Sequence, residues 1–247
     1  MNHPLDGAKL KVVRAQEHLD AFKRELGAYH DSEPVEWVTT FDKPGFVTAT
    51  PAIKEVPAHL SCIIGDCVTN LNAALDYIAW QIGLKFRTPP VVVGKDKPYY
   101  LAPHTLTRNG ATVDPTAFAL LQSMQPTVAG YEPLKTLNQL VNEDKHRLPL
   151  LTVAVIKPRH ISVITTETPP RTVISFPTPP VWSTTGGFVV DLSLEGSRPE
   201  DVRVISGGSA FITFENPLMP REPAEFTLDK IVKCVADIVP RFEPLFA

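Results

Sequence analysis

Residues 57–83, PAHLSCIIGDCVTNLNAALDYIAWQIG, carry the strongest helical pattern in the chain. Apolar side chains recur every three or four positions, which is the repeat of an α-helix with one buried face. That face consists of Ile64, Cys67, Leu71, Leu75, Ile78 and Ile82. We expect Ser61 or a neighbouring residue to begin this helix and Gly83 to end it.

A second stripe runs along the other side of the same helix at about 100° per residue. It consists of Asp66, Thr69, Ala73, Asp76 and Trp80. This stripe contains no Lys or Glu and ends in a tryptophan, so it differs from a solvent-facing surface. We therefore expect the helix to be covered on both sides, with carboxylates on one of them.

Four further segments show helical patterns. Residues 8–29 repeat apolar side chains at helical spacing, and residues 227–239 form an amphipathic helix near the C-terminus. In DPTAFALLQSM, Asp114 is placed to cap a short helix whose first turn contains Pro115. A helix over 132–148 should stop before Pro149, because the residue preceding a proline avoids helical geometry.

Strand patterns occur at two places in the first half of the chain and dominate its second half. Residues 35–53 predict a hairpin with DKPG as its turn, and 89–94, PPVVVG, a short strand. From residue 150 the period changes to two, and strands are expected within 150–158, 160–168, 171–177, 186–196, 201–206 and 209–216. ISGGSA, 205–210, predicts a tight hairpin between the last two.

This order predicts a single α+β domain over residues 1–247. A helical layer from the helix-rich part, 1–149, would pack on a mostly C-terminal antiparallel sheet from the strand-rich part, 150–225. A C-terminal helix within 226–247 would close the domain.

The composition limits the environment of the protein. The formal net charge of −3 gives no general attraction to nucleic acid or to anionic membranes. The apolar runs are shorter than the roughly 20 residues that cross a bilayer, and the N-terminus has no signal-peptide core. Three cysteines without CxxC spacing predict no disulfide framework. We expect a soluble cytoplasmic protein; its oligomeric state stays open.

The stretch LNQLVNEDKHRLPLLTV, residues 137–153, places Asp144 on the inward stripe with Leu137 and Val141. A buried carboxylate is costly unless it is paired or hydrogen-bonded. The partner could be Arg147, a group on another element or a ligand, and a structural clamp is one complete explanation. The cations of DKHR also suit the negative end of a helix dipole.

Metal and cofactor motifs are missing. Glu143 and His146 have the Glu-x-x-His spacing of carboxylate-bridged metal sites, but those sites need a second such motif. The helix at 57–83 offers only Asp66 with Thr69. The sequence therefore predicts neither a metal nor a cofactor.

Three segments together resemble a family of uncharacterised bacterial proteins: KLKVVRAQEHLDAF, LSCIIGDCVTNLNAALDYIAWQI and LNQLVNEDKHRLPLL. The resemblance covers roughly the first 150 residues. Here Thr69 stands where the family often has histidine, and Asn72 where it often has arginine. No activity comes with the resemblance. It strengthens the grouping of Asp66, Asn70, Asp76, Trp80, Asp144, His146 and Arg147.

We expect these side chains to meet between helices in a pocket for a small polar or anionic ligand. Asp66, Asp76, Asp144 and His146 would be the catalytic candidates of a hydrolase, and Asn70, Trp80 and Arg147 the ligand-binding ones. A non-enzymatic scaffold is the main alternative. A HEPN-like ribonuclease is another, although Arg14 to His18 is one residue short of its R-x4–6-H motif.

Overall fold

A computed structural model describes residues 3–43, 46–149, 151–155, 161–165, 172–175, 181–182, 188–191, 202–206 and 210–247. Its contacts divide the chain into two compact units. The helical unit consists of Met1–Gly27, Pro57–Leu151 and Phe214–Ala247, and the strand unit of Ala28–Val56 and Thr152–Thr213. The strand unit takes residues from both halves of the chain. The assignment of all residues to one domain stays a prediction.

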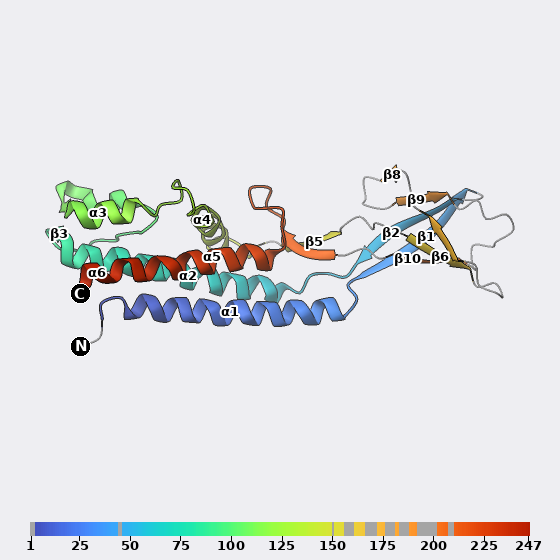
Figure 1. Cartoon of the computed structure of the whole chain (residues 1–247), viewed down its shortest axis with the longest axis horizontal. Helices are drawn as coiled ribbons and strands as arrows, with labels where there is room; N and C mark the ends of the chain where they lie inside the picture. The colour runs from blue at the N-terminus through green and yellow to red at the C-terminus, as the bar shows by residue number, and fades with distance from the viewer. Residues whose placement is uncertain are drawn as a thin grey trace. The chain divides into compact units, whose positions relative to one another are not determined.

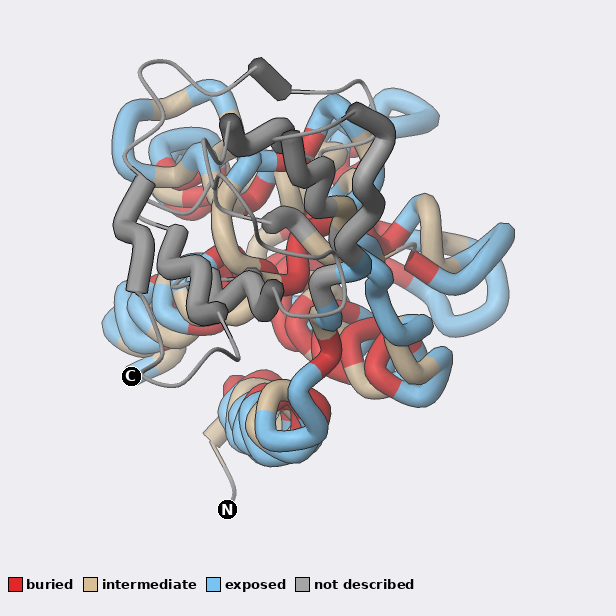
Figure 2. Tube along the Cα trace, turned by 90° about the vertical axis from the view of Figure 1, so that its right-hand side faces the viewer, coloured by how far each residue is buried: buried red, intermediate tan, exposed pale blue. Residues whose placement is uncertain are grey.

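Three long helices run side by side through the helical unit: α1 (Asp6–Asp31), α2 (Ala58–Phe86) and α5 (Ala224–Ile238) (Figure 1). All six residues of the apolar face predicted for 57–83 are buried, as are Ile231, Val235 and Ile238 of α5. Buried segments gather where the helices meet (Figure 2). Cys67 lies in this core and its thiol donates to the carbonyl of Ala15 at 3.4 Å, so it is a packing residue.

The start predicted for α2, at Ser61 or a neighbouring residue, lies within one turn of the observed one, and the end predicted at Gly83 was wrong. The helix begins at Ala58, and Ser61 caps nothing: its hydroxyl donates to the carbonyl of Pro149 at 2.6 Å. Gly83 lies inside the helix, where a Cβ would stand 2.5 Å from Cγ1 of Val91. Glycine at 83 thus allows the following chain to pack against the helix, and α2 continues for three more residues because nothing there stops it.

The segment after α2 folds back along the helix. β3 (Arg87–Thr88) pairs with β4 (Thr112–Val113), and the 3₁₀ segment η1 (Pro103–Gly110) lies between them. The strand predicted for 89–94 was wrong, since these residues form a loop in which Val91 is buried and Val92 and Val93 are exposed. The three valines resemble the composition of a strand, but this segment forms no strand pairing, so it stays a loop.

Two shorter helices complete the central part of this unit. α3 (Pro115–Gln122) confirms the Asp114 cap, whose carboxylate accepts from the amides of Thr116 and Ala117 at 3.0 Å each. α4 (Pro133–Asp144) ends four residues earlier than predicted. The amides of His146 and Arg147 both bond to the carbonyl of Glu143, which turns the chain out of the helix before Pro149.

The C-terminal helix is confirmed, although it begins at Ala224 instead of residue 227. Two short helical segments follow it, η3 (Val239–Phe242) and α6 (Glu243–Phe246). Phe242 is fully buried and meets the ring of Tyr100 edge-on, with centroids 6.1 Å apart. α5 ends before Pro240, and Pro240 and Pro244 lie in the first turns of the two segments that follow.

The strand unit contains small sheets. The predicted hairpin is confirmed as β1 (Val35–Lys43) and β2 (Phe46–Ile53), paired antiparallel with Val35 opposite Ile53; half of its DKPG turn lies outside the described residues. β2 also pairs with β9 (Phe188–Asp191), which pairs with β8 (Val181–Trp182). A second sheet has the order β10 (Val202–Ser206), β6 (Ile161–Thr165), β7 (Thr172–Ser175).

The six strands predicted after residue 150 are all present, but they do not form one C-terminal sheet. β5 (Leu151–Val155) joins β11 (Ala210–Phe214), and β9 extends the N-terminal hairpin. The turn predicted at 205–210 falls partly outside the described residues, and the strands flanking it belong to different sheets. The chain is thus helix-rich with small antiparallel sheets and a C-terminal helix. A helical layer on a single sheet stays a prediction.

Candidate functional site

One face of α2 is lined by Gly65, Thr69, Asn72, Asp76 and Trp80, which follow helical spacing. The end of α4 packs on its first part. There the carboxylate of Asp144 lies against Gly65, so closely that a Cβ at Gly65 would be 2.2 Å from Oδ1 of Asp144. The hydroxyl of Thr69 points to Oδ2 of Asp144 at 3.5 Å. The missing side chain of Gly65 explains how a carboxylate fits on an otherwise apolar stripe.

Arg147 is not the partner of Asp144. Its guanidinium donates from Nη2 to Oε1 of Glu143 at 3.0 Å. The helical wheel placed residue 147 one turn beyond Asp144, but α4 has already ended there. Asp144 is half-buried at the end of α4, and its carboxylate lies against Gly65 and Thr69 of α2.

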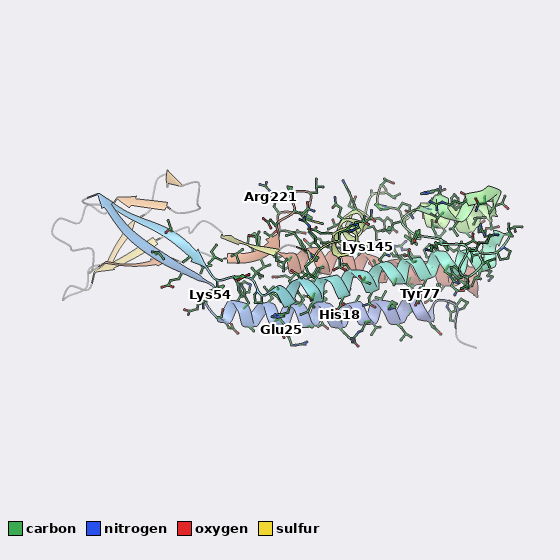
Figure 3. The ribbon with its side chains drawn as sticks, turned by 180° about the vertical axis from the view of Figure 1, so that it is seen from behind. His18, Glu25, Lys54, Tyr77, Lys145 and Arg221 are labelled. Atoms are coloured by element: carbon green, nitrogen blue, oxygen red, sulfur yellow. The ribbon has the colours of Figure 1, made fainter. Side chains whose placement is uncertain are left out.

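Asp76 is held by two hydrogen bonds farther along α2. The amide of Tyr100 donates to Oδ1 at 3.1 Å, and Nδ2 of Asn72 donates to Oδ2 at 2.9 Å. Burial raises the pKa of Asp76 from 3.8 to about 6, while both hydrogen bonds and the charge of Lys145 oppose that rise. Figure 3 labels Lys145 at the end of α4 and Tyr77 on α2.

A groove of about 510 Å³ opens beside Asp76. One wall comes from α2 and the other from the loop of residues 96–99. Its lining consists of Asp76, Tyr77, Trp80, Gln81, Asp96, Lys97, Pro98 and Tyr99. Asp76 and Trp80, both predicted as site residues, thus lie together, with three aromatic rings around one carboxylate of raised pKa.

Arg87 holds the loop wall in place through hydrogen bonds, and it is not among the predicted site residues. Its side chain is 4% exposed and donates to the carbonyls of Leu106 at 2.8 Å and Pro89 at 2.9 Å. Nη2 also reaches Oδ1 of Asp96 at 3.3 Å, and Oδ2 of Asp96 accepts from the amide of Val92 at 2.9 Å. One feature of the sequence could have indicated this role: Arg87 follows a long apolar helix and precedes two prolines.

Asp66 and Asn70 lie away from this groove. Asp66 is exposed, and its backbone carbonyl accepts from Nδ2 of Asn70 at 2.8 Å. Oδ1 of Asn70 accepts from Nζ of Lys11 at 3.1 Å, so Asn70 faces α1. Neither side chain lines the groove at Asp76.

His146 and Arg147 line a second, more open pocket of about 370 Å³. Its other members are Gln139, Asn142, Glu143 and Asn216. The Glu143 side chain is only 7% exposed and accepts from both Arg147 and Asn216. The two pockets share no lining residue. The predicted cluster therefore divides among the groove, the α2–α4 contact, the α1 side and this pocket.

The other predicted features can be placed in the same way. Within the described ranges no three His, Cys, Asp or Glu side chains are grouped as a metal would require. No helix in those ranges is long and apolar enough to cross a membrane. Arg14, the closest approach to a ribonuclease motif, pairs with Glu17 at 2.6 Å on the exposed side of α1.

Comparison of the chain with models of protein families, with curated proteins and with solved structures finds no match. Any function must therefore be inferred from the geometry of the chain itself.

The raised pKa of Asp76 predicts how its neutral variant behaves. The folded state holds the proton to about pH 6, whereas an unfolded aspartate releases it near 3.8, so this group lowers stability as pH rises between those values. The stability of Asp76→Asn relative to the wild type should then rise by about 2 kcal/mol between pH 4.5 and pH 8, because only the wild type loses stability over that range. Urea denaturation at both pH values measures this, and a variant that loses stability selectively at pH 8 would show that the carboxylate is a structural clamp.

Proposed function

We propose that this chain binds a small polar molecule in the groove between α2 and residues 96–99. The observation that carries the proposal is the Asp76 carboxylate, largely buried and with its pKa raised to about 6, beside Tyr77, Trp80 and Tyr99. Ionisable groups with perturbed pKa values cluster at functional sites, because burying them costs stability. The two hydrogen bonds from Tyr100 and Asn72 offset part of that cost, and the position of the carboxylate at the groove supports a role in binding.

The size and lining of the groove support a ring-shaped ligand. Small-molecule pockets occupy about 300–1,000 Å³ and combine apolar walls with a few placed polar groups. The groove volume of about 510 Å³ falls inside that range. Aromatic side chains provide flat surfaces for a ring, and Asp76 and Gln81 provide polar contacts at its edge.

The same geometry favours binding over hydrolysis. Asp76 can act as a general base near neutral pH, since catalytic bases work best when their pKa is close to the operating pH. The second carboxylate of the groove, Asp96, is paired with Arg87, so no other acid in the described lining is free to protonate a leaving group. Hydrolytic activity is therefore a separate proposal that binding does not require.

Asp144 supports the scaffold alternative for one part of the predicted cluster. Its carboxylate contacts Gly65 and Thr69 and lines neither of the two pockets described above. We assign Asp144 to the packing of α4 on α2, and the ligand-binding role to the groove.

Binding of one-ring probes tests the proposal. In ¹⁵N-NMR titrations, benzyl alcohol and its charged analogues should shift the amides of residues 76–81 and 96–100. Tyr99→Ala should weaken binding about tenfold, the equivalent of roughly 1.4 kcal/mol from one lost ring face. Tyr99 is 44% exposed, so truncation should leave the fold intact.

Phe226→Ala is the matched control, because Phe226 is an aromatic residue of the same unit, 55% exposed and remote from the groove lining. Its affinity for the probes should equal that of the wild type. Shifts confined to the pocket of His146 and Arg147, or equal losses in both variants, would contradict the proposal.

A further inference from the structure

We infer that the ligand of this groove is a monoanion: an apolar ring that carries a carboxylate or similar acidic group, held by Lys97. This inference rests on the proposed function and specifies the ligand class of the same site. It follows from which polar groups of the lining are already used by the protein and which are not.

The two carboxylates of the groove are engaged. Asp96 accepts from the guanidinium of Arg87 and the amide of Val92, one bond on each oxygen. Asp76 accepts from the amide of Tyr100 and from Asn72 in the same way. Both acids are thus partly satisfied by the protein, which weakens their attraction for a cationic ligand.

The donors of the lining are free by contrast. Lys97 is exposed and makes no ion pair or hydrogen bond with any described residue. The half-buried side chains of Trp80 and Gln81 make no hydrogen bond with any described residue either. An ammonium offers three donors, an indole one and an amide two. A ligand rich in acceptors satisfies this set, whereas a ligand rich in donors does not.

The local charges agree with this donor excess. Arg87 and Asp96 form a pair whose charges cancel, and Lys145 lies close enough to Asp76 to lower its pKa. At pH 8 Asp76 is ionised, so the charges of Asp76, Asp96, Arg87 and Lys97 sum to about zero, and Lys97 is the lining cation without a carboxylate partner among the described residues. Its ammonium gives an anion a local place to bind on a chain whose formal charge is −3.

The apolar part of the lining accounts for the ring. Tyr77, Trp80, Pro98 and Tyr99 form most of both walls. Tyr77 is positioned by α1, because a Cβ at Gly7 would stand 2.9 Å from Cδ2 of the Tyr77 ring. The ring therefore rests on bare backbone, which limits its movement and keeps that wall of the groove in place.

Three probes of nearly equal size and different charge test the inference: benzoate, benzyl alcohol and benzylamine. At pH 8 and low salt, NMR titration should give affinities in the order benzoate, benzyl alcohol, benzylamine. Lys97→Gln should weaken benzoate about tenfold or more, the size of one charge-assisted hydrogen bond, and leave benzyl alcohol within about twofold. Raising the salt concentration should reduce the benzoate advantage, because Lys97 is exposed and screened.

Lys95→Gln is the matched control, since Lys95 is also exposed, two residues away and absent from the groove lining. It should leave all three affinities unchanged. Equal losses of benzoate binding in both lysine variants would show a general surface attraction and overturn the inference. So would tighter binding of benzylamine, or benzoate binding that survives Lys97→Gln.

The inference and the proposed function fail in different ways. If the three probes bind in the groove without a preference for benzoate, small-molecule binding stands and the ligand is not an anion. If none of them shifts the resonances of residues 76–81 and 96–100, the groove is not the binding site and both proposals fall. Bound benzoate should also raise the pKa of Asp76, because a second negative charge nearby disfavours its ionised form.

Discussion

Replacing Arg87 by methionine should lower the free energy of unfolding of the helical unit by about 3 kcal/mol, the range observed when one partner of a buried ion pair is removed. The guanidinium is 4% exposed and makes three interactions, with Leu106, Pro89 and Asp96. Methionine fills much of the same space, so the loss reports the polar contacts rather than a cavity. Two backbone carbonyls and a largely buried carboxylate would lose their donor.

The second consequence concerns the groove. Arg87 is a positioning residue, because it connects the end of α2 to the loop that carries Asp96 and the neighbouring Lys97. Arg87→Met should therefore also weaken benzoate binding under conditions in which the variant is fully folded. A purely structural role would leave the affinity of the folded fraction unchanged.

Arg108→Met is the matched control for this substitution. Arg108 lies in the same segment and is exposed, and its side chain makes a hydrogen-bond contact of 3.3 Å with the ring of His104. Its replacement should change stability by less than about 0.5 kcal/mol. Urea denaturation followed by circular dichroism at 222 nm reports the helices; equal effects of the two substitutions would refute the role given to Arg87.

The helices were predictable because each one buries a stripe that repeats with helical spacing. Their ends were less so. Gly83 carries a standard stop signal, yet it lies inside α2 because Val91 packs on it. The glycine is needed because a side chain at this position would collide with Val91. It does not mark the end of the helix.

Strands were predictable individually and their partners were not. Alternating side chains identify β9 and β11, but nothing local states that β9 adds to the N-terminal hairpin or that β11 joins β5. Pairing is a long-range property, since the energy of a strand comes from neighbours distant in sequence. The single C-terminal sheet assumed that strands adjacent in sequence pair with each other.

The helical wheel predicted some of the side-chain neighbours and missed others for one geometric reason, and the functional role of these residues stays a prediction. The helical wheel correctly brought Asp76 and Trp80 to one face of α2. It could not show that Asn70 meets Lys11 on α1, nor that α4 stops at Asp144 and sends His146 and Arg147 to another pocket. A helical wheel gives the direction in which a side chain points, but it does not show which other element the side chain meets. Arg87 was missed because two of its partners are backbone carbonyls and the third, Asp96, lies nine residues away in a loop without helical or strand periodicity.

A double-mutant cycle on Gly65 and Asp144 should reveal the contact that fixes α4 on α2. Glycine inside a helix costs about 1 kcal/mol relative to alanine, so Gly65→Ala gains that amount if nothing else changes. In the wild type the new Cβ would meet Oδ1 of Asp144 at 2.2 Å and force the short side chain aside. Overpacking of this kind costs about 1–3 kcal/mol, and we expect a net loss of about 1–2 kcal/mol.

In the Asp144→Ala background the obstacle is gone. Gly65→Ala should then raise stability by up to about 1 kcal/mol, so the coupling energy between the two positions is roughly 2 kcal/mol, near the upper part of the range for residues in contact. Gly27→Ala supplies the reference, because Gly27 lies in α1 and a Cβ added there would have no atom within 4 Å. It should show the helix-propensity gain in both backgrounds.

Urea denaturation of the four combinations of Gly65 and Asp144 variants measures the coupling. If Gly65→Ala has the same effect with and without the Asp144 carboxylate, the glycine is not there to accommodate it. A strong coupling, with groove affinity for benzyl alcohol unchanged throughout, would instead separate the packing acid Asp144 from the ligand-facing acid Asp76.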